Sequence, residues 1–228
     1  MMKIIDNFKD RQNKLNYGEI LWDLDVSRYM EFKDVDDISK WGARYYNQWA
    51  EVYKKNMNIA KSVLRGSVVS APVECYCGEL YRQINEYLRF DRDNDNYNYR
   101  ELANILSIAL ATAPRVPQDV VVYRLVCDSF IEELIDHNKR GSVVQEKGFM
   151  STSLLSSIVN VNEIYTNEVN ILKLYVNKGS IGIYVNSITK RSEQELLLYP
   201  NSFLKLLKYP YYDERLNKIV WECEVFYF

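Results

Sequence analysis

The chain has 228 residues, of which 47% are hydrophobic, and its formal net charge is −2. The length fits one domain with a sizeable core, and the charge provides no basic field that would favour nucleic acid as a partner. No apolar run reaches the roughly 18 residues of a membrane span, and the N-terminal residues lack the apolar stretch of a signal peptide. We therefore expect a single domain, residues 1–228, with neither a membrane nor a nucleic acid as its partner.

Residues that commonly bind metals or act as nucleophiles are scarce in the chain. Four cysteines are scattered along it, and the nearest two, Cys75 and Cys77, are spaced more tightly than zinc ligands usually are. We expect free thiols and no metal. Because His137 is the only histidine, a Ser-His-Asp or Cys-His mechanism would depend on that one residue. If the chain is an enzyme, its acid and base groups are expected to be carboxylates.

The first half of the chain predicts helices. Between Ile38 and Val52, apolar residues recur at helical spacing, and Asp36 and Asp37 precede them, where the helix dipole favours negative charge. The polar stretch 91–98 is rich in turn-forming residues and predicts a loop. Further helices are predicted over residues 57–64, 76–89 and 99–112.

After Pro117 the pattern changes from helices to strands. Residues 120–126, Val-Val-Val-Tyr-Arg-Leu-Val, read as a buried strand, and a short helix is predicted over 129–136. Further strands are predicted over residues 148–153, 169–176, 181–185, 195–199, 203–207 and 219–228. Helices followed by strands indicate an α+β domain.

Three of these strands carry polar side chains that the apolar pattern does not explain. Arg124 lies within an apolar strand, where a guanidinium needs an anion, either an internal carboxylate or a ligand phosphate. The hydroxyl run at 151–153, Ser-Thr-Ser, requires hydrogen-bond partners unless it faces solvent at a strand end. Glu193 and Glu195 would point to one side of a strand. Because like charges that close repel, the pair indicates either a solvated strand entry or a site for a cation.

Taken in order, Arg124, the Ser-Thr-Ser run and the Glu193-x-Glu195 pair resemble the Arg / Ser-Thr-Ser / Glu-x-Glu signature of the ADP-ribosylating toxins. The segment 84–89, Ile-Asn-Glu-Tyr-Leu-Arg, is similar to the Ile-Asn-x-x-Leu-Arg helix of clostridial toxins. The resemblance covers about residues 31–228. It is most like the single-domain Rho-modifying exoenzymes and the catalytic halves of binary actin-modifying toxins.

The resemblance implies a fold of two small β-sheets packed at a steep angle, with NAD in the cleft between them and an N-terminal helical subdomain at its flank. Residues 1–75 are then expected to form the helical part and residues 76–228 the NAD-binding catalytic core. NAD is implied as a substrate, without a metal. The chain has only 8 glycines and lacks a Gly-rich phosphate loop, so arginines are expected to bind the pyrophosphate.

The resemblance also assigns residues to NAD. In the resembling toxins, the positions of Asn85 and Arg89 contact NAD, as does an arginine three residues later, where this chain has Arg92. Asn85 and Arg89 are four residues apart and so share a helix face. Arg124 is implied to bind a phosphate or to hold the nicotinamide side of the cofactor.

The carboxylates are implied to carry the chemistry. Ser151 would hydrogen-bond Glu195, and Glu195 would bind the 2′-hydroxyl of the nicotinamide ribose and stabilise the oxocarbenium-like state. Glu193 would orient or deprotonate the acceptor guanidinium. Because family members with Glu at that position modify arginine, an arginine acceptor is expected. Lys190 stands where relatives often carry an aromatic residue that touches the protein substrate, so the recognition surface is expected to be unusual.

The partner implied by the resemblance is a host protein, with actin or a small GTPase as the most plausible target. The chain would be a monomeric bacterial toxin or effector, secreted or delivered, that acts in the host cytoplasm. Two other enzymatic hypotheses stand beside this one: an NAD glycohydrolase with water as acceptor, and a transferase acting on a non-arginine residue of a small GTPase. A third hypothesis is a binding module that keeps the fold without activity.

Overall fold

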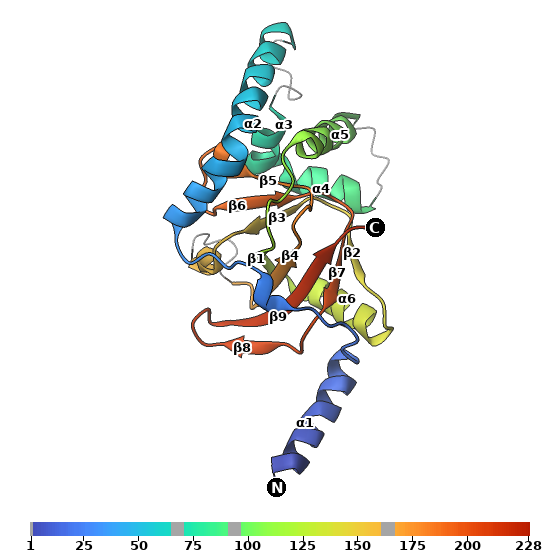
Figure 1. Cartoon of the computed structure of the whole chain (residues 1–228). Helices are drawn as coiled ribbons and strands as arrows, with labels where there is room; N and C mark the ends of the chain where they lie inside the picture. Colours follow the sequence, from blue (N-terminus) through green and yellow to red (C-terminus); the bar gives the residue numbers. More distant parts are fainter. Residues whose placement is uncertain (1, 65–70, 91–96, 161–166) are drawn as a thin grey trace.

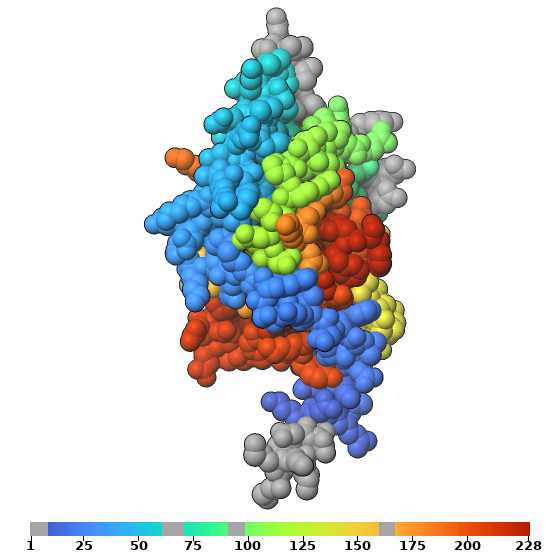
Figure 2. All heavy atoms as spheres, viewed as in Figure 1, coloured from blue at the N-terminus to red at the C-terminus, as the bar shows by residue number. Residues whose placement is uncertain are grey.

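The computed structural model describes residues 2–64, 71–90, 97–160 and 167–228. The chain starts with helix α1 (Met2–Tyr17), a 3₁₀ turn η1 (Val26–Arg28) and the long helix α2 (Val35–Leu64). Figure 1 shows α1 and α2 extending from opposite ends of the molecule. Figure 2 shows the segment between them lying across the front face. Met30 in that segment forms a parallel bridge with Val120, which fixes the segment to the sheet.

Helix α2 is longer than the sequence pattern predicted. Asp34 caps its N-terminus, where Oδ1 accepts a hydrogen bond from the backbone N–H of Asp37 at 2.8 Å. Two separate helices were expected over 38–52 and 57–64, but one helix runs through both. The intervening residues contain no glycine or proline, and Tyr53 among them is buried in the core, so nothing interrupts the helix.

A second group of helices follows, and it contains a break where the sequence predicted none. The expected helix over 76–89 includes a π turn in which Gly78 has φ −87° and ψ −110°, outside the helical region. Such turns are frequent at functional sites. The elements of this group are α3 (Pro72–Cys75), the π turn η3 (Tyr76–Leu80), α4 (Tyr81–Phe90) and α5 (Tyr97–Thr112).

The described residues after α5 include a nine-stranded sheet with strand order β2-β7-β9-β4-β1-β3-β6-β5, and β8 pairs with the first residues of β9. Its strands are β1 (Val120–Val126), β2 (Val144–Glu146), β3 (Met150–Ser153), β4 (Asn170–Val176), β5 (Gly182–Tyr184), β6 (Glu195–Leu198), β7 (Ser202–Leu206), β8 (Tyr211–Asp213) and β9 (Lys218–Phe226). Strands β4 and β9 are parallel, and the other pairs are antiparallel. Helix α6 (Asp128–Lys139) connects β1 to β2, and short 3₁₀ turns are η4 (Ser156–Asn160) and η5 (Val185–Ser187).

The sheet consists of two halves that meet at a single pair of residues. Strand β1 pairs with β4 along its full length, from Val120 to Val126. It pairs with β3 only at Tyr123 and Ser153. The strands of the smaller half, β3, β6 and β5, run in a different direction from β1, β4 and β9 (Figure 1). The α+β fold with two small sheets is thereby confirmed, and the two sheets share one hydrogen-bonded junction.

Helices α6 and α5 pack on the sheet in two different hydrophobic clusters. Leu134 of α6 packs in one hydrophobic cluster with Leu172 and Trp221 of the larger half. Leu106 of α5 packs in a second cluster with Leu197 of the smaller half. Burial of such side chains contributes on the order of 1.5–3 kcal/mol each. The first cluster also includes Leu196 of β6, so this core extends across the junction into the smaller half.

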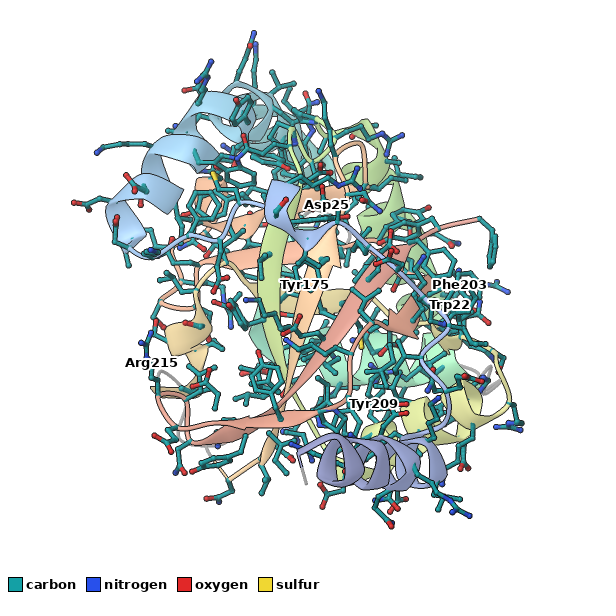
Figure 3. The ribbon with its side chains drawn as sticks, turned by 60° about the horizontal axis from the view of Figure 1, so that its bottom comes forward. Trp22, Asp25, Tyr175, Phe203, Tyr209 and Arg215 are labelled. Atoms are coloured by element: carbon teal, nitrogen blue, oxygen red, sulfur yellow. The ribbon has the colours of Figure 1, made fainter. Side chains whose placement is uncertain are left out.

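Figure 3 shows one face of the larger half from below, with Tyr175 near its middle and Tyr209 beside α1. The hydroxyl of Tyr175 donates a hydrogen bond to Glu222 Oε2 at 2.8 Å. The rings of Tyr209 and Tyr17 lie 6.2 Å apart, so α1 is held to the body by its C-terminal end. Within the described ranges, no helix has both the length and the hydropathy of a membrane span.

Candidate active site

A cleft of about 360 Å³ lies at the junction of the two sheet halves. It contains most of the residues that the sequence assigned to a site: Asn85, Arg124, Ser151, Glu193 and Glu195 all line it. The other lining residues are Tyr76, Cys77, Gly78, Tyr81, Tyr123, Leu125, Thr152, Ser153, Ile158 and Arg191. Chain segments far apart in the sequence thus meet in one place, because both the π turn and the sheet junction face this cleft.

Glu195 is the most enclosed carboxylate of the cleft. It is the first residue of β6, and only 3% of its surface is exposed to solvent. Ser151 Oγ donates a hydrogen bond to Glu195 Oε1. The backbone N–H of Glu195 donates to Asn186 Oδ1 at 3.3 Å. The carboxylate is therefore fixed in position before any ligand arrives.

The three hydroxyls of the Ser-Thr-Ser run all have hydrogen-bond partners within the protein, and Thr152 and Ser153 are buried whereas Ser151 is exposed. Ser151 donates to Glu195 as described, and Thr152 Oγ1 donates to the carbonyl of Leu196 at 2.6 Å. Ser153 Oγ donates to the carbonyl of Glu193 at 2.6 Å. The run therefore fixes the start of β6 and the residues immediately before it.

Glu193 reaches the cleft for a reason other than strand periodicity. It precedes β6, and Gln194 between the two carboxylates has φ +50°, in the left-handed region. A non-glycine residue there costs on the order of 1–3 kcal/mol unless its surroundings hold it. Gln194 is buried, and Tyr184 donates a hydrogen bond from its hydroxyl to Gln194 Oε1 at 2.5 Å. This contact fixes the turn that brings both carboxylates to the cleft.

Arg191 joins the two carboxylates, and sequence reasoning did not assign it to the site. Its Nε and Nη2 each lie 3.1 Å from an oxygen of Glu193. Its Nε also lies 3.3 Å from Glu195 Oε2. Its Nη1 donates to the carbonyl of Cys77 in the π turn. The sequence contained one indication of this role. Two neighbouring carboxylates need a cation, and Arg191 is the cationic residue nearest to them in the sequence.

The pKa values of the two carboxylates are shifted in opposite directions. Burial raises the pKa of Glu195, against the hydrogen bond from Ser151 and the charge of Arg191, which favour the ionised form. Burial is also the largest influence on Glu193, but the hydrogen bonds and charge of Arg191, together with a backbone hydrogen bond, jointly outweigh it and hold the pKa of Glu193 below its usual range. Carboxylates whose pKa values diverge in this way are suited to different roles in one reaction.

Arg124 projects from β1 into the cleft, and its side chain is partly exposed rather than buried. Its Nη1 donates to the main-chain carbonyl of Ser151 at 3.0 Å. No carboxylate in the described part of the chain forms an ion pair with it. Of the two anions considered for Arg124, the internal carboxylate is therefore not observed.

Asn85 and Arg89 share a face of α4, and both contact the segment that joins β2 to β3. Asn85 accepts a hydrogen bond from the N–H of Phe149 at 2.9 Å and donates to its carbonyl at 3.2 Å. Arg89 binds Glu146 in a two-pronged ion pair, with N–O distances of 2.9 and 2.8 Å. Gly148 leaves room for this arrangement, because a Cβ there would lie 2.8 Å from Asn85 Oδ1. Asn85 lines the cleft, whereas Arg89 does not.

Lys190, which the sequence assigned to substrate recognition, does not line the cleft. Lys190 is exposed in the loop between η5 and β6, next to Arg191. Arg92 lies outside the described residues. No group of three metal-binding side chains occurs within the described residues.

Known proteins resemble the chain in sequence pattern and in fold. The model of the ADP-ribosyltransferase exoenzyme family matches residues 38–224. BECa, an ADP-ribosylating toxin of C. perfringens solved with NADH, is 22% identical with a TM-score of 0.66, and the match covers 87% of this chain and 50% of BECa. The C3 exoenzyme of Clostridium limosum is 17% identical with a TM-score of 0.64, over 89% of this chain and 99% of that one.

A further neighbour is C2-I, the enzymatic component of the Clostridium botulinum C2 toxin, with 21% identity, a TM-score of 0.60 and coverage of 88% and 50%. The chain thus spans about half the length of BECa and of C2-I, and nearly all of the C3 exoenzyme. At these identities the likeness is one of fold. No curated protein sequence matches the chain.

Proposed function

Because the chain belongs to the ADP-ribosyltransferase exoenzyme family, we propose that it transfers ADP-ribose from NAD to an arginine side chain of a target protein and releases nicotinamide. One observation carries the arginine part of this proposal: the carboxylates of Glu193 and Glu195 already bind a guanidinium, that of Arg191. A site that binds one guanidinium through both carboxylates has the charge and hydrogen-bonding capacity to bind another.

NAD is proposed to bind in the cleft, and BECa, which shares the fold, was solved with NADH. Arg124 provides a planar guanidinium that suits a phosphate, and it faces the cleft from β1. Asn85 binds the backbone of Phe149, and Arg89 binds the carboxylate of Glu146. These contacts fix the start of β3 beside Ser151. Asn85 also borders the cleft and is the member of this pair proposed to touch NAD.

The two carboxylates have different roles in the reaction. Glu195 binds the 2′-hydroxyl of the nicotinamide ribose, and its charge stabilises the cation that forms as the bond between C1′ and nicotinamide breaks. Ser151 keeps Glu195 oriented for this task. Glu193 takes the proton from the acceptor guanidinium as its nitrogen bonds to C1′. Nicotinamide leaves with the electron pair of the broken bond.

The biological setting is proposed from the relatives. BECa is an ADP-ribosylating toxin and C2-I is the enzymatic component of a toxin, and this chain shares their fold. We expect a monomeric toxin or effector that acts in a host cytoplasm on actin or a small GTPase. Lys190 is exposed in the loop before β6 and directly precedes Arg191, so we propose that it contacts that protein substrate.

Incubation with NAD and agmatine, a small guanidine, tests the proposal. Putrescine, which carries an amine in place of the guanidine, is the matched control acceptor. The proposal predicts ADP-ribosyl-agmatine and free nicotinamide, with no corresponding putrescine adduct. An adduct with neither acceptor, despite nicotinamide release, would refute guanidine transfer.

That negative result would favour the alternative function, an NAD glycohydrolase. A specific observation supports this alternative, because Arg191 occupies both carboxylates and could leave water as the only acceptor that reaches C1′. The same assay separates the two functions, since the glycohydrolase releases ADP-ribose in amounts equal to nicotinamide whether or not agmatine is present.

A further inference from the structure

Arg191 occupies the position that the proposed function assigns to the target's arginine. Its guanidinium contacts both Glu193 and Glu195, and its side chain is 28% exposed and lines the cleft. Arg124 lines the same cleft but bonds to a main-chain carbonyl instead of a carboxylate. Arg191 is therefore the arginine of the cleft that is placed as an acceptor.

The loop that carries Arg191 is anchored to the rest of the molecule. Asn186 Nδ2 donates to the carbonyl of Arg191 at 2.5 Å, and Asn186 Oδ1 accepts from the N–H of Glu195. Lys54 of α2 donates to the carbonyl of Ser187 at 2.9 Å. These contacts hold the loop from two sides, so the guanidinium of Arg191 is held beside the carboxylates.

We propose that Arg191 is itself an acceptor, and that without another guanidine the enzyme transfers ADP-ribose from NAD to Arg191 of its own chain. This inference rests on the proposed function, because it uses the same bond cleavage. The bond from C1′ of the ribose to nicotinamide breaks, and nicotinamide leaves with the electron pair. A new bond forms between C1′ and Nη2 of Arg191. The displaced proton passes to Glu193 Oε1, which is already 3.1 Å from that nitrogen.

One modification of Arg191 should block any further modification of the same molecule. An ADP-ribosyl group on Arg191 remains attached inside the cleft, where it occupies both the NAD site and the acceptor site. Each molecule therefore accepts one group and then stops. Unmodified Arg191 also competes with an external guanidine for Glu193 and Glu195, so excess agmatine should protect Arg191 from modification.

The test uses the full chain with NAD and no added acceptor. Intact mass spectrometry should show a gain of one ADP-ribosyl group, and peptide fragmentation should locate it on Arg191. Arg191→Lys keeps the positive charge but lacks the guanidine, and it should lose the modification. Arg215→Lys, a matched change at an exposed arginine labelled in Figure 3, should retain it. Thermal unfolding of both variants checks that they fold.

Two further measurements decide between the possible outcomes. The fraction modified per unit time should not change over a tenfold dilution of the enzyme, because the reaction occurs within one chain. A rate that falls with dilution would overturn the proposal in favour of transfer between copies. If the enzyme modifies agmatine when it is supplied, but no ADP-ribosyl group appears on Arg191 when agmatine is omitted, the inference is overturned and the proposed function stays intact. Nicotinamide release with neither product would overturn the proposed function.

Discussion

Arg124 of the larger sheet half donates a hydrogen bond to the carbonyl of Ser151 in the smaller half, at 3.0 Å across the junction. The same Ser151 donates its own hydroxyl hydrogen bond to Glu195. One chain of contacts therefore runs from the proposed phosphate-binding arginine to the buried carboxylate. It connects cofactor binding with the position of Glu195, because both depend on how the two halves meet.

Arg124→Lys tests the phosphate contact. Lysine keeps the charge but lacks the planar fork, so we expect the Kd for NAD to rise by roughly tenfold, equivalent to ~1.4 kcal/mol. Isothermal titration calorimetry measures this directly. The free energy of unfolding should change little, since the side chain is partly exposed. An unchanged Kd would show that Arg124 does not bind the cofactor.

Arg89→Met tests whether the face of α4 is structural. Glu146, which is 5% exposed, would lose its ion-pair partner and remain buried. An unpaired buried polar group costs about 1–3 kcal/mol, and we expect the lower part of that range because Arg89 is 34% exposed. Urea unfolding measures the loss. The double variant Arg89→Met, Glu146→Gln should regain part of it. If Arg89→Met instead kept its stability and lost NAD binding, Arg89 would be a cofactor ligand.

Glu195→Gln should stabilise the protein while it abolishes NAD cleavage. The pKa of Glu195 is raised by burial, so the folded state binds its proton more tightly than the unfolded state. Stability therefore falls as pH rises through this raised pKa, and the ionised carboxylate reduces stability at neutral pH. Removal of the charge should raise Tm, by roughly 2–4 °C for each 1 kcal/mol gained. A lower Tm at pH 7 would contradict this explanation.

The activity should depend on pH through the same group. Ionised Glu195 is required to stabilise the cation, so kcat/KM for nicotinamide release should fall on the acid side. Its midpoint should lie above the ordinary glutamate value of 4.5, because burial raises the pKa of Glu195. The pKa of Glu193 is lowered, so Glu193 does not set this limb. A midpoint at or below the ordinary value would assign the limb to another group.

Much of the fold followed from local patterns. The apolar run 120–126 and the helical periodicity that begins at Ile38 are long, regular signals, and both elements are present. Strands β2 and β8 have three residues each, which is too short for an alternating pattern to be recognised. The separate boundaries expected within α2 were wrong because residues 53–56 contain no helix breaker.

The sequence predicted several residues of the cleft and the Ser151–Glu195 hydrogen bond, but it did not predict Arg191 or the backbone that places the carboxylates. The order of Arg124, Ser151 and Glu195 is visible in the sequence. The left-handed backbone at Gln194 depends on Tyr184 from another strand. The placement of Arg191 depends on the π turn that offers the carbonyl of Cys77. The expected boundary between a helical part and a catalytic core at residue 75 stays a prediction.

The measurement that tests the account most directly compares wild type and Glu193→Gln in the presence of NAD and agmatine. The quantity is the ratio of ADP-ribosyl-agmatine to nicotinamide, with Glu195→Gln as the control that should release neither. We predict that Glu193→Gln lowers this ratio at least tenfold while some nicotinamide release persists, because Glu193 serves the acceptor and Glu195 serves NAD. If the ratio stays unchanged, or if both products disappear together in Glu193→Gln, the proposed division between the two carboxylates is wrong.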